Sequence, residues 1–78
     1  MITESELIDV FKNNLVTTME EKGYSQKDLS YETGLSEMTI SRYVNGQSMP
    51  KLSALFNIAM VLDCELEELV GYVDMVAF

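Results

Sequence analysis

The sequence of 78 residues predicts a small all-α domain in which five helices surround one hydrophobic core. Three observations favour this class. Apolar residues recur at three- and four-residue steps along most of the chain, residues that cap helix N-termini precede several of these runs, and glycines follow them. A chain of this length supports one core. We therefore place a single domain at residues 1–71, followed by a short apolar tail at residues 72–78.

The first expected helix covers residues 3–22. Thr3 and Glu6 have the spacing of a capping box, and Gly23 supplies a stop signal. Apolar residues then recur on one face of this helix, and we expect that face to contribute to the core. These residues are Leu7, Val10, Phe11, Leu15 and Met19.

A second, short helix is expected to follow Ser25. Ser25 can cap it, and Asp28 can reach back to the Ser25 amide as a reduced capping box. Leu29 and Thr33 share one face at the i,i+4 spacing. Gly34 should end this helix, because a sharp reversal into another helix needs a residue that tolerates positive φ.

The third expected helix covers residues 36–45, with Ser36 as its cap and Gly46 as its stop. Its apolar stripe consists of Leu35, Ile40, Tyr43 and Val44. Two short helices joined by a turn of three or four residues that contains glycine match the helix-turn-helix motif. The second helix of that motif can lie in the major groove of DNA.

Two further helices complete the expected fold. Pro50 fits the first turn of the fourth helix, where a missing amide costs nothing. This strongly apolar helix should be the central packing element, through Leu52, Leu55, Phe56, Ile58, Ala59 and Leu62. The fifth covers residues 65–70 and ends at Gly71. We expect Met19 and Met60 to pack inside, whereas Met38 should point toward a ligand.

The composition excludes several classes of protein. Cys64 is the only cysteine, so no internal disulfide can form, and this indicates a reducing compartment. We expect Cys64 to lie in or near the core. Because the sequence has no histidine and one cysteine, we expect no transition-metal site. The N-terminus lacks the pattern of a signal peptide, and no apolar run reaches the length of a membrane span. No nucleophile–base pair or phosphate-binding glycine loop occurs. We expect a cytoplasmic protein that is not an enzyme and has no cofactor, metal or membrane association.

The charge is strongly acidic, at a net −8, whereas DNA-binding domains usually carry a basic face. The acidic residues are unevenly distributed. Residues 1–22 carry five acids against two lysines, residues 23–51 carry three acids against three bases, and residues 52–78 carry five acids and no base. The helix-turn-helix region is therefore locally neutral, and we expect weaker nonspecific DNA affinity than a basic domain would have.

Residues 11–69 resemble the XRE family of phage-repressor-like helix-turn-helix domains. The resemblance is carried by GYSQKDLSYETGLSEMTISRYVNGQSMPKLSALFNIAMVLDCELEEL. It includes the Ser-Gln opening of the second helix, Gly34, the Ser36 cap and the Asn45-Gly46 exit. The resemblance implies a five-helix DNA-binding domain, a bacterial or phage-encoded source, and a sequence-specific transcriptional regulator whose recognition helix is residues 36–45.

The resemblance also implies the DNA-contacting residues. Gln26 would contact a phosphate and brace the recognition helix. Base edges would be met by Glu37, Met38, Ser41 and Arg42, and Ser36 belongs to the same interface as the cap of this helix. The backbone would be held by Lys27, Thr39, Asn45 and Lys51. An alternative for Arg42 is a surface ion pair with Glu37 or Glu32. Glu37 departs from the neutral amide that is common in this family.

Two further expectations concern partners. The protein should bind double-stranded DNA as a homodimer, since one short helix reads few base pairs. The tail at residues 72–78 is a possible self-association element or folds back on its own domain. The alternative function is an acidic protein-interaction module of the same fold, antirepressor-like or antitoxin-like, with little DNA binding.

Overall fold

The computed structural model describes residues 2–71. These residues form five helices and no strand, so the predicted all-α class is confirmed. The helices are α1 (Glu4–Lys22), α2 (Gln26–Thr33), α3 (Glu37–Val44), α4 (Leu52–Leu62) and α5 (Leu66–Val70). The tail at residues 72–78 lies outside the described residues, and its expected role stays a prediction.

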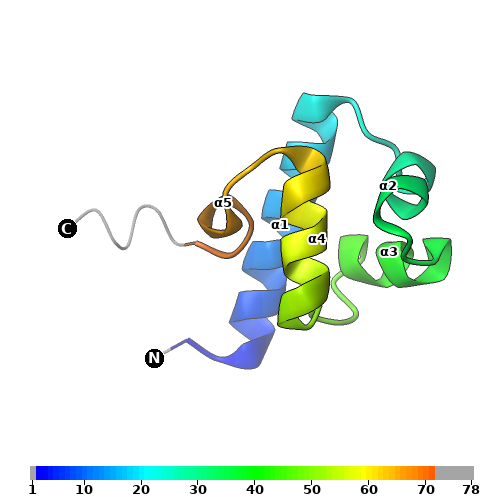
Figure 1. The fold of residues 1–78 in the computed structure, drawn as a ribbon. Coiled ribbons are helices and arrows are strands. Elements are labelled where there is room, and N and C mark those ends of the chain that lie inside the picture. Colours follow the sequence, from blue (N-terminus) through cyan, green and yellow to red (C-terminus); the bar gives the residue numbers. More distant parts are fainter. Residues whose placement is uncertain (1, 72–78) are drawn as a thin grey trace.

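Helices α1 and α4 lie at the centre of the molecule (Figure 1). Helix α5 lies on one side of this pair, and α2 and α3 lie together on the other side. Helix α1 contacts α3, α4 and α5, while α2 contacts α3 and α4. The α2–α3 pair is therefore held against α1 and α4, with α3 on α1 and α2 on α4.

The core draws on all five helices. Phe11 of α1 meets Tyr43 of α3 edge to face, with ring centroids 5.9 Å apart and an interplanar angle of 80°, a favoured geometry for aromatic pairs. Asn14 of α1 donates from Nδ2 to the Leu69 carbonyl of α5 over 3.1 Å. The largest fully buried side chains are Phe11, Leu15, Leu29, Ile40, Ile58, Leu62 and Leu69.

The predicted start and end of α1 are confirmed. The Glu6 amide donates to Thr3 Oγ1 over 3.1 Å, and the Thr3 amide donates to Glu6 Oε1 over 2.9 Å. These bonds form a capping box that pairs two amides at the helix start. At the other end Gly23 adopts φ 75°, in the left-handed region that glycine reaches without strain.

The predicted position of Pro50 is wrong by two residues. Helix α4 begins at Leu52, with Lys51 as an extended N-cap at φ −71° and ψ 166°. Pro50 therefore precedes the first turn, and it is buried. Pro50 is thus packed against the domain, and the first helical position, where a proline would lack no hydrogen bond, is taken by Leu52.

The predicted packing of α4 is correct for one face and wrong for the other. Leu55, Ile58, Ala59 and Leu62 are buried as expected, together with Ala54. Met60, expected inside, is 78% exposed, and Leu52 and Phe56 are 64% and 48% exposed. The contacting helices cover one side of α4 only, so the apolar residues on its opposite side face outward.

Met19 and Cys64 lie where the sequence predicted them. Met19 is buried at 5% exposure in the core cluster. Cys64 is a free, half-buried thiol that packs against that cluster. Among the described residues, no helix has both the length and the apolar character needed to cross a membrane.

Candidate nucleic-acid interface

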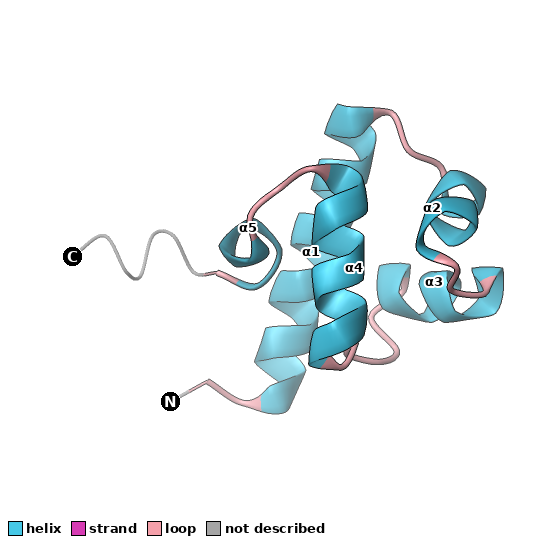
Figure 2. Cartoon of the chain, in the orientation of Figure 1, coloured by secondary structure: helices cyan, strands magenta, loops and turns pink. Residues whose placement is uncertain are grey.

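A tight turn joins α2 to α3 (Figure 2). Helix α2 ends at Thr33, and Gly34 takes φ 79° and ψ 2° while its amide donates to the Ser30 carbonyl over 2.9 Å. A residue with a Cβ is strained at this φ. The chain then re-enters a helix at once, since Ser36 is already the N-cap of α3. The glycine turn and both helix boundaries agree with the sequence-based prediction.

Side-chain hydroxyls fix the shape of this turn. Ser30 Oγ donates to the Leu35 carbonyl over 2.5 Å, and Thr33 Oγ1 donates to the Leu29 carbonyl over 2.7 Å. Thr33 Oγ1 also accepts from the Leu35 amide over 3.2 Å. These bonds link the end of α2 to the residue before the α3 cap. The angle between the two helices is thus held by polar groups as well as by packing.

A residue from α4 completes this support, and the sequence reasoning did not identify it. Asn57 donates from Nδ2 to the Thr33 carbonyl over 2.7 Å. This carbonyl belongs to the last residue of α2, where no further helical amide can pair with it. The signal was available in the sequence, because Asn57 is the one carboxamide in the apolar run LSALFNIAMVL.

The start of α2 presents two candidate residues to solvent. Gln26 and Lys27 are both exposed. Beside them, Ser25 and Asp28 form a capping box, with bonds of 3.1 Å and 3.0 Å. The hydrogen bond from the Ser25 amide is the main cause that lowers the pKa of Asp28, and the hydrogen bond with the Ser25 side chain adds to it. The ionised carboxylate therefore offsets part of the positive potential at this helix start.

The two hydroxyl groups at the start of α3, those of Ser36 and Thr39, differ in how far they are engaged in hydrogen bonds. Ser36 Oγ accepts from the Thr39 amide over 3.1 Å and donates to Thr39 Oγ1 over 2.9 Å. The Ser36 hydroxyl is therefore engaged as donor and as acceptor inside the cap. Thr39 Oγ1 acts as the acceptor in this pair, so the Thr39 hydroxyl hydrogen remains able to donate to an external oxygen.

Helix α3 separates an inner face from an outer face. Ile40 is fully buried and Tyr43 is 7% exposed. On the outer face Glu37, Met38 and Arg42 are exposed, and Ser41 is half-buried. Met38 is 68% exposed, which confirms its expected outward position. The residues expected to meet base edges therefore share one helix and one side of it.

Arg42 keeps its guanidinium available. Its Nη2 lies 4.0 Å from Met38 Sδ, one turn earlier on the same face. Across residues 2–71, neither Glu37 nor Glu32 forms the ion pair with Arg42 that the sequence left open. Apart from this long contact of Nη2 with sulfur, the guanidinium has no partner among residues 2–71, so its remaining donors can meet an external acceptor.

The remaining candidates lie beyond the exposed face of α3. Asn45 Nδ2 donates to the Ser41 carbonyl over 2.8 Å and to Ser41 Oγ over 3.2 Å, so its amide group closes the end of the helix. The Asn45 side-chain oxygen is the part left for another partner. Lys51 is exposed but belongs to the N-cap of α4, separated from α3 by the intervening loop.

These features define the class of the protein as a helix-turn-helix domain, and a comparison with protein families agrees. The family HTH_3, described as helix-turn-helix, matches residues 17–69. The chain belongs to this family, which confirms the resemblance to the XRE family that the sequence had indicated.

A solved structure with the same fold carries the description "HTH_3 family Transcriptional Regulator from Vibrio cholerae". The TM-score is 0.85 at 20% sequence identity, and the match covers 95% of this chain. The chain spans 42% of the length of that regulator. The likeness therefore concerns the fold of one part of a longer protein. No curated protein matches the chain.

Proposed function

We propose that the protein is a sequence-specific DNA-binding transcriptional regulator, with α3 as the recognition helix in the major groove. Membership of the helix-turn-helix family supports DNA binding. The similar solved structure is itself described as a transcriptional regulator. The second helix of such a motif is the one that enters the groove.

The observation that supports this function best is the outer face of α3. Arg42 is free of carboxylate partners among residues 2–71 and can make a bidentate contact with the O6 and N7 atoms of guanine. Glu37 can accept a hydrogen bond from N4 of cytosine, and the exposed Met38 can contact the methyl group of thymine. Ser41 can donate or accept. A single face thus offers contacts for several base types.

Contacts to the DNA backbone would come from residues around this face. The Thr39 hydroxyl has a hydrogen to donate to a phosphate oxygen, and Lys27 supplies a positive charge. Gln26, Asn45 and Lys51 are also exposed and would add contacts. Ser36 would act through the cap, because its hydroxyl is engaged in holding the start of α3.

The charge distribution affects how such binding would work. The protein carries a net −8, and the helix-turn-helix region at residues 23–51 is neutral. The chain as a whole therefore repels DNA at long range, and displacement of counterions contributes little to the affinity. Specific hydrogen bonds at short range would supply a larger share of the binding free energy than in a basic domain.

A second candidate function is protein binding without DNA binding, on the same fold. The acidic composition favours it, because the chain carries a net −8 and residues 23–51 are neutral, whereas nucleic-acid-binding domains usually carry a basic face. Under this alternative the outer face of α3 would contact another protein, and its residues would show no base preference.

Selection of bound duplexes from a random DNA library at low salt tests the proposal. The protein is expected to enrich one motif, arranged as a pseudo-palindrome if it binds as a dimer. The Arg42→Ala variant, tested in parallel, should enrich a motif that is relaxed at one base pair. Failure of the wild-type protein to enrich any motif would contradict DNA reading and support the second candidate.

A further inference from the structure

Helix α4 has an exposed apolar stripe that the proposed DNA contact does not use. Leu52, Phe56 and Met60 follow one another at steps of four residues, so they lie along one side of the helix. They are 64%, 48% and 78% exposed. Because the opposite side of α4 packs in the core, this helix is apolar on two faces. Helices of that kind are normally covered on both faces.

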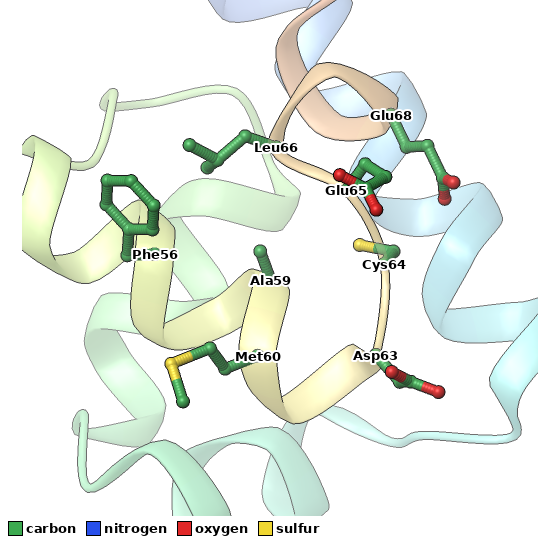
Figure 3. Close-up of a pocket in the computed structure, with 8 residues that line it drawn as sticks. All are labelled: Phe56, Ala59, Met60, Asp63, Cys64, Glu65, Leu66 and Glu68. Atoms are coloured by element: carbon green, nitrogen blue, oxygen red, sulfur yellow. The ribbon is translucent and has the colours of Figure 1, made fainter.

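A hollow adjoins the stripe between α4 and α5 (Figure 3). Its volume is about 560 Å³, and Phe56 and Met60 line it together with Ala59, Cys64 and Leu66. The close-up shows Phe56 and Met60 on α4 and Leu66 at the start of α5. The stripe and the hollow form one continuous surface. Contiguous exposed apolar surface of this kind marks interaction sites.

The charges at the two ends of the stripe are opposite. Lys51 stands immediately before Leu52. At the other end Asp63, Glu65 and Glu68 line the hollow. Burial is the main cause that raises the pKa of the Cys64 thiol at this end; the charge of Glu68 adds to the shift and that of Lys22 opposes it. A positive end and a negative end on one apolar stripe make the surface complementary to a copy of itself turned end to end.

We propose that this stripe is a self-association surface, on which two copies of the chain pack α4 against α4 in antiparallel orientation. A two-fold axis passes near Phe56, and Leu52 lies against Met60 of the partner subunit. Lys51 of each copy then approaches the acidic end of the other. A parallel arrangement would instead place the three carboxylates of each copy side by side, which like-charge repulsion disfavours.

The size of the surface sets the expected strength of the dimer. Helix α4 has 11 residues, so it is roughly 16 Å long at about 1.5 Å per residue. A contact along one such helix is smaller than the roughly 800 Å² per partner of a standard interface. We therefore expect a dimer that dissociates in the micromolar range.

Sedimentation of the full chain without DNA tests the surface. The wild-type protein should change from monomer to dimer over a micromolar to millimolar concentration series. Met60→Glu and Leu52→Glu should each weaken this association at least about tenfold, because they place a charge in the apolar contact. Tyr31→Glu is the matched control, since Tyr31 is an 88% exposed apolar residue on α2. Circular dichroism verifies that each variant is folded.

Cysteine cross-linking tests the orientation, in a Cys64→Ala background. Phe56→Cys should form a disulfide-linked dimer on oxidation, since its Cβ would face its own copy across the axis. Leu52→Cys and Met60→Cys should cross-link poorly alone and efficiently when the two variants are mixed. Self-cross-linking of both variants would show parallel packing and overturn the proposal.

Two results of the sedimentation experiment would overturn the proposal as well. One is a wild-type protein that stays monomeric at every concentration, and the other is a set of stripe variants that dimerise like Tyr31→Glu. None of these results depends on DNA binding.

Discussion

The carboxamide of Asn57, in the middle of α4, donates to the carbonyl of Thr33, the last residue of α2, over 2.7 Å. The two residues are 24 positions apart in the chain. The Thr33 hydroxyl also donates to the Leu29 carbonyl and accepts from the Leu35 amide, on the far side of the turn. This bond therefore connects the supporting helix α4 directly to the point where the helix-turn-helix reverses.

Asn57→Ala should lower the free energy of unfolding by about 1–3 kcal/mol, because it leaves a partly buried carbonyl without its donor. Chemical denaturation measures the change. Asn13→Ala on the exposed side of α1 is the control, and it should stay within about 0.5 kcal/mol of the wild type. Equal effects of the two substitutions would show that the bond to Thr33 contributes nothing.

Gly34→Val should destabilise the domain by about 1–3 kcal/mol. Outside Gly34 and its two chain neighbours, no atom lies within 4 Å of the position that a Cβ at Gly34 would take, so the cost arises from the backbone at φ +79°. Gly34→Asn should cost less, because asparagine tolerates this region better. Thermal melting of Gly34→Val within a degree or two of the parent would contradict a required positive φ.

Arg42→Ala should weaken binding to the best DNA site by about 1–3 kcal/mol and relax the preference at one base pair. Titration of the selected duplex and of its single-base variants measures both effects. Lys22→Ala is the matched control, because it removes the same charge from the far end of α1, where Lys22 Nζ contacts the Asp63 carbonyl. If Lys22→Ala reduced affinity and preference as much as Arg42→Ala, the assignment of Arg42 to a base edge would be wrong.

The salt dependence of DNA binding should be shallow. Only Lys27, Arg42 and Lys51 carry positive charge within residues 23–51. The slope of log affinity against log salt should therefore correspond to about two to three phosphates per domain. A titration of the selected site from low to physiological salt measures it. A steep slope would place the binding surface elsewhere on the molecule.

Stability should decrease in acid through the two capping carboxylates. Hydrogen bonds from the Thr3 backbone and hydroxyl lower the pKa of Glu6 below 4.5, and those from Ser25 lower the pKa of Asp28 below 3.8. A depressed folded-state pKa stabilises the fold above the unfolded-state pKa, and this stabilisation is lost as the pH falls through the folded-state value. Denaturation curves from pH 7 to pH 2 measure the loss.

The double variant Glu6→Gln and Asp28→Asn serves as the control for this dependence. It keeps side-chain oxygens able to accept the capping bonds but removes the titrating groups. Its stability should change less with pH below about pH 4.5 than that of the wild type. An identical pH dependence in both proteins would assign the acid sensitivity to other carboxylates.

The sequence by itself determined the local structure of this protein. The capping boxes at Thr3 and Ser25, the Ser36 cap and the positive-φ Gly34 all form as predicted. Each of these features depends on groups within about four residues of one another, and such short-range geometry follows from residue type and spacing. The outward face of α3 followed similarly from its periodicity, because Ile40 and Tyr43 define the buried side.

Contacts between distant segments were decided only by the tertiary structure. The bond from Asn57 to Thr33 depends on how α4 lies against α2, which no local pattern specifies. The exposure of Met60 was predicted wrongly for the same reason. A helix with apolar residues on two sides does not indicate which side the rest of the chain covers. That choice depends on the positions of the neighbouring helices, and in α4 it leaves the stripe from Leu52 to Met60 in solvent.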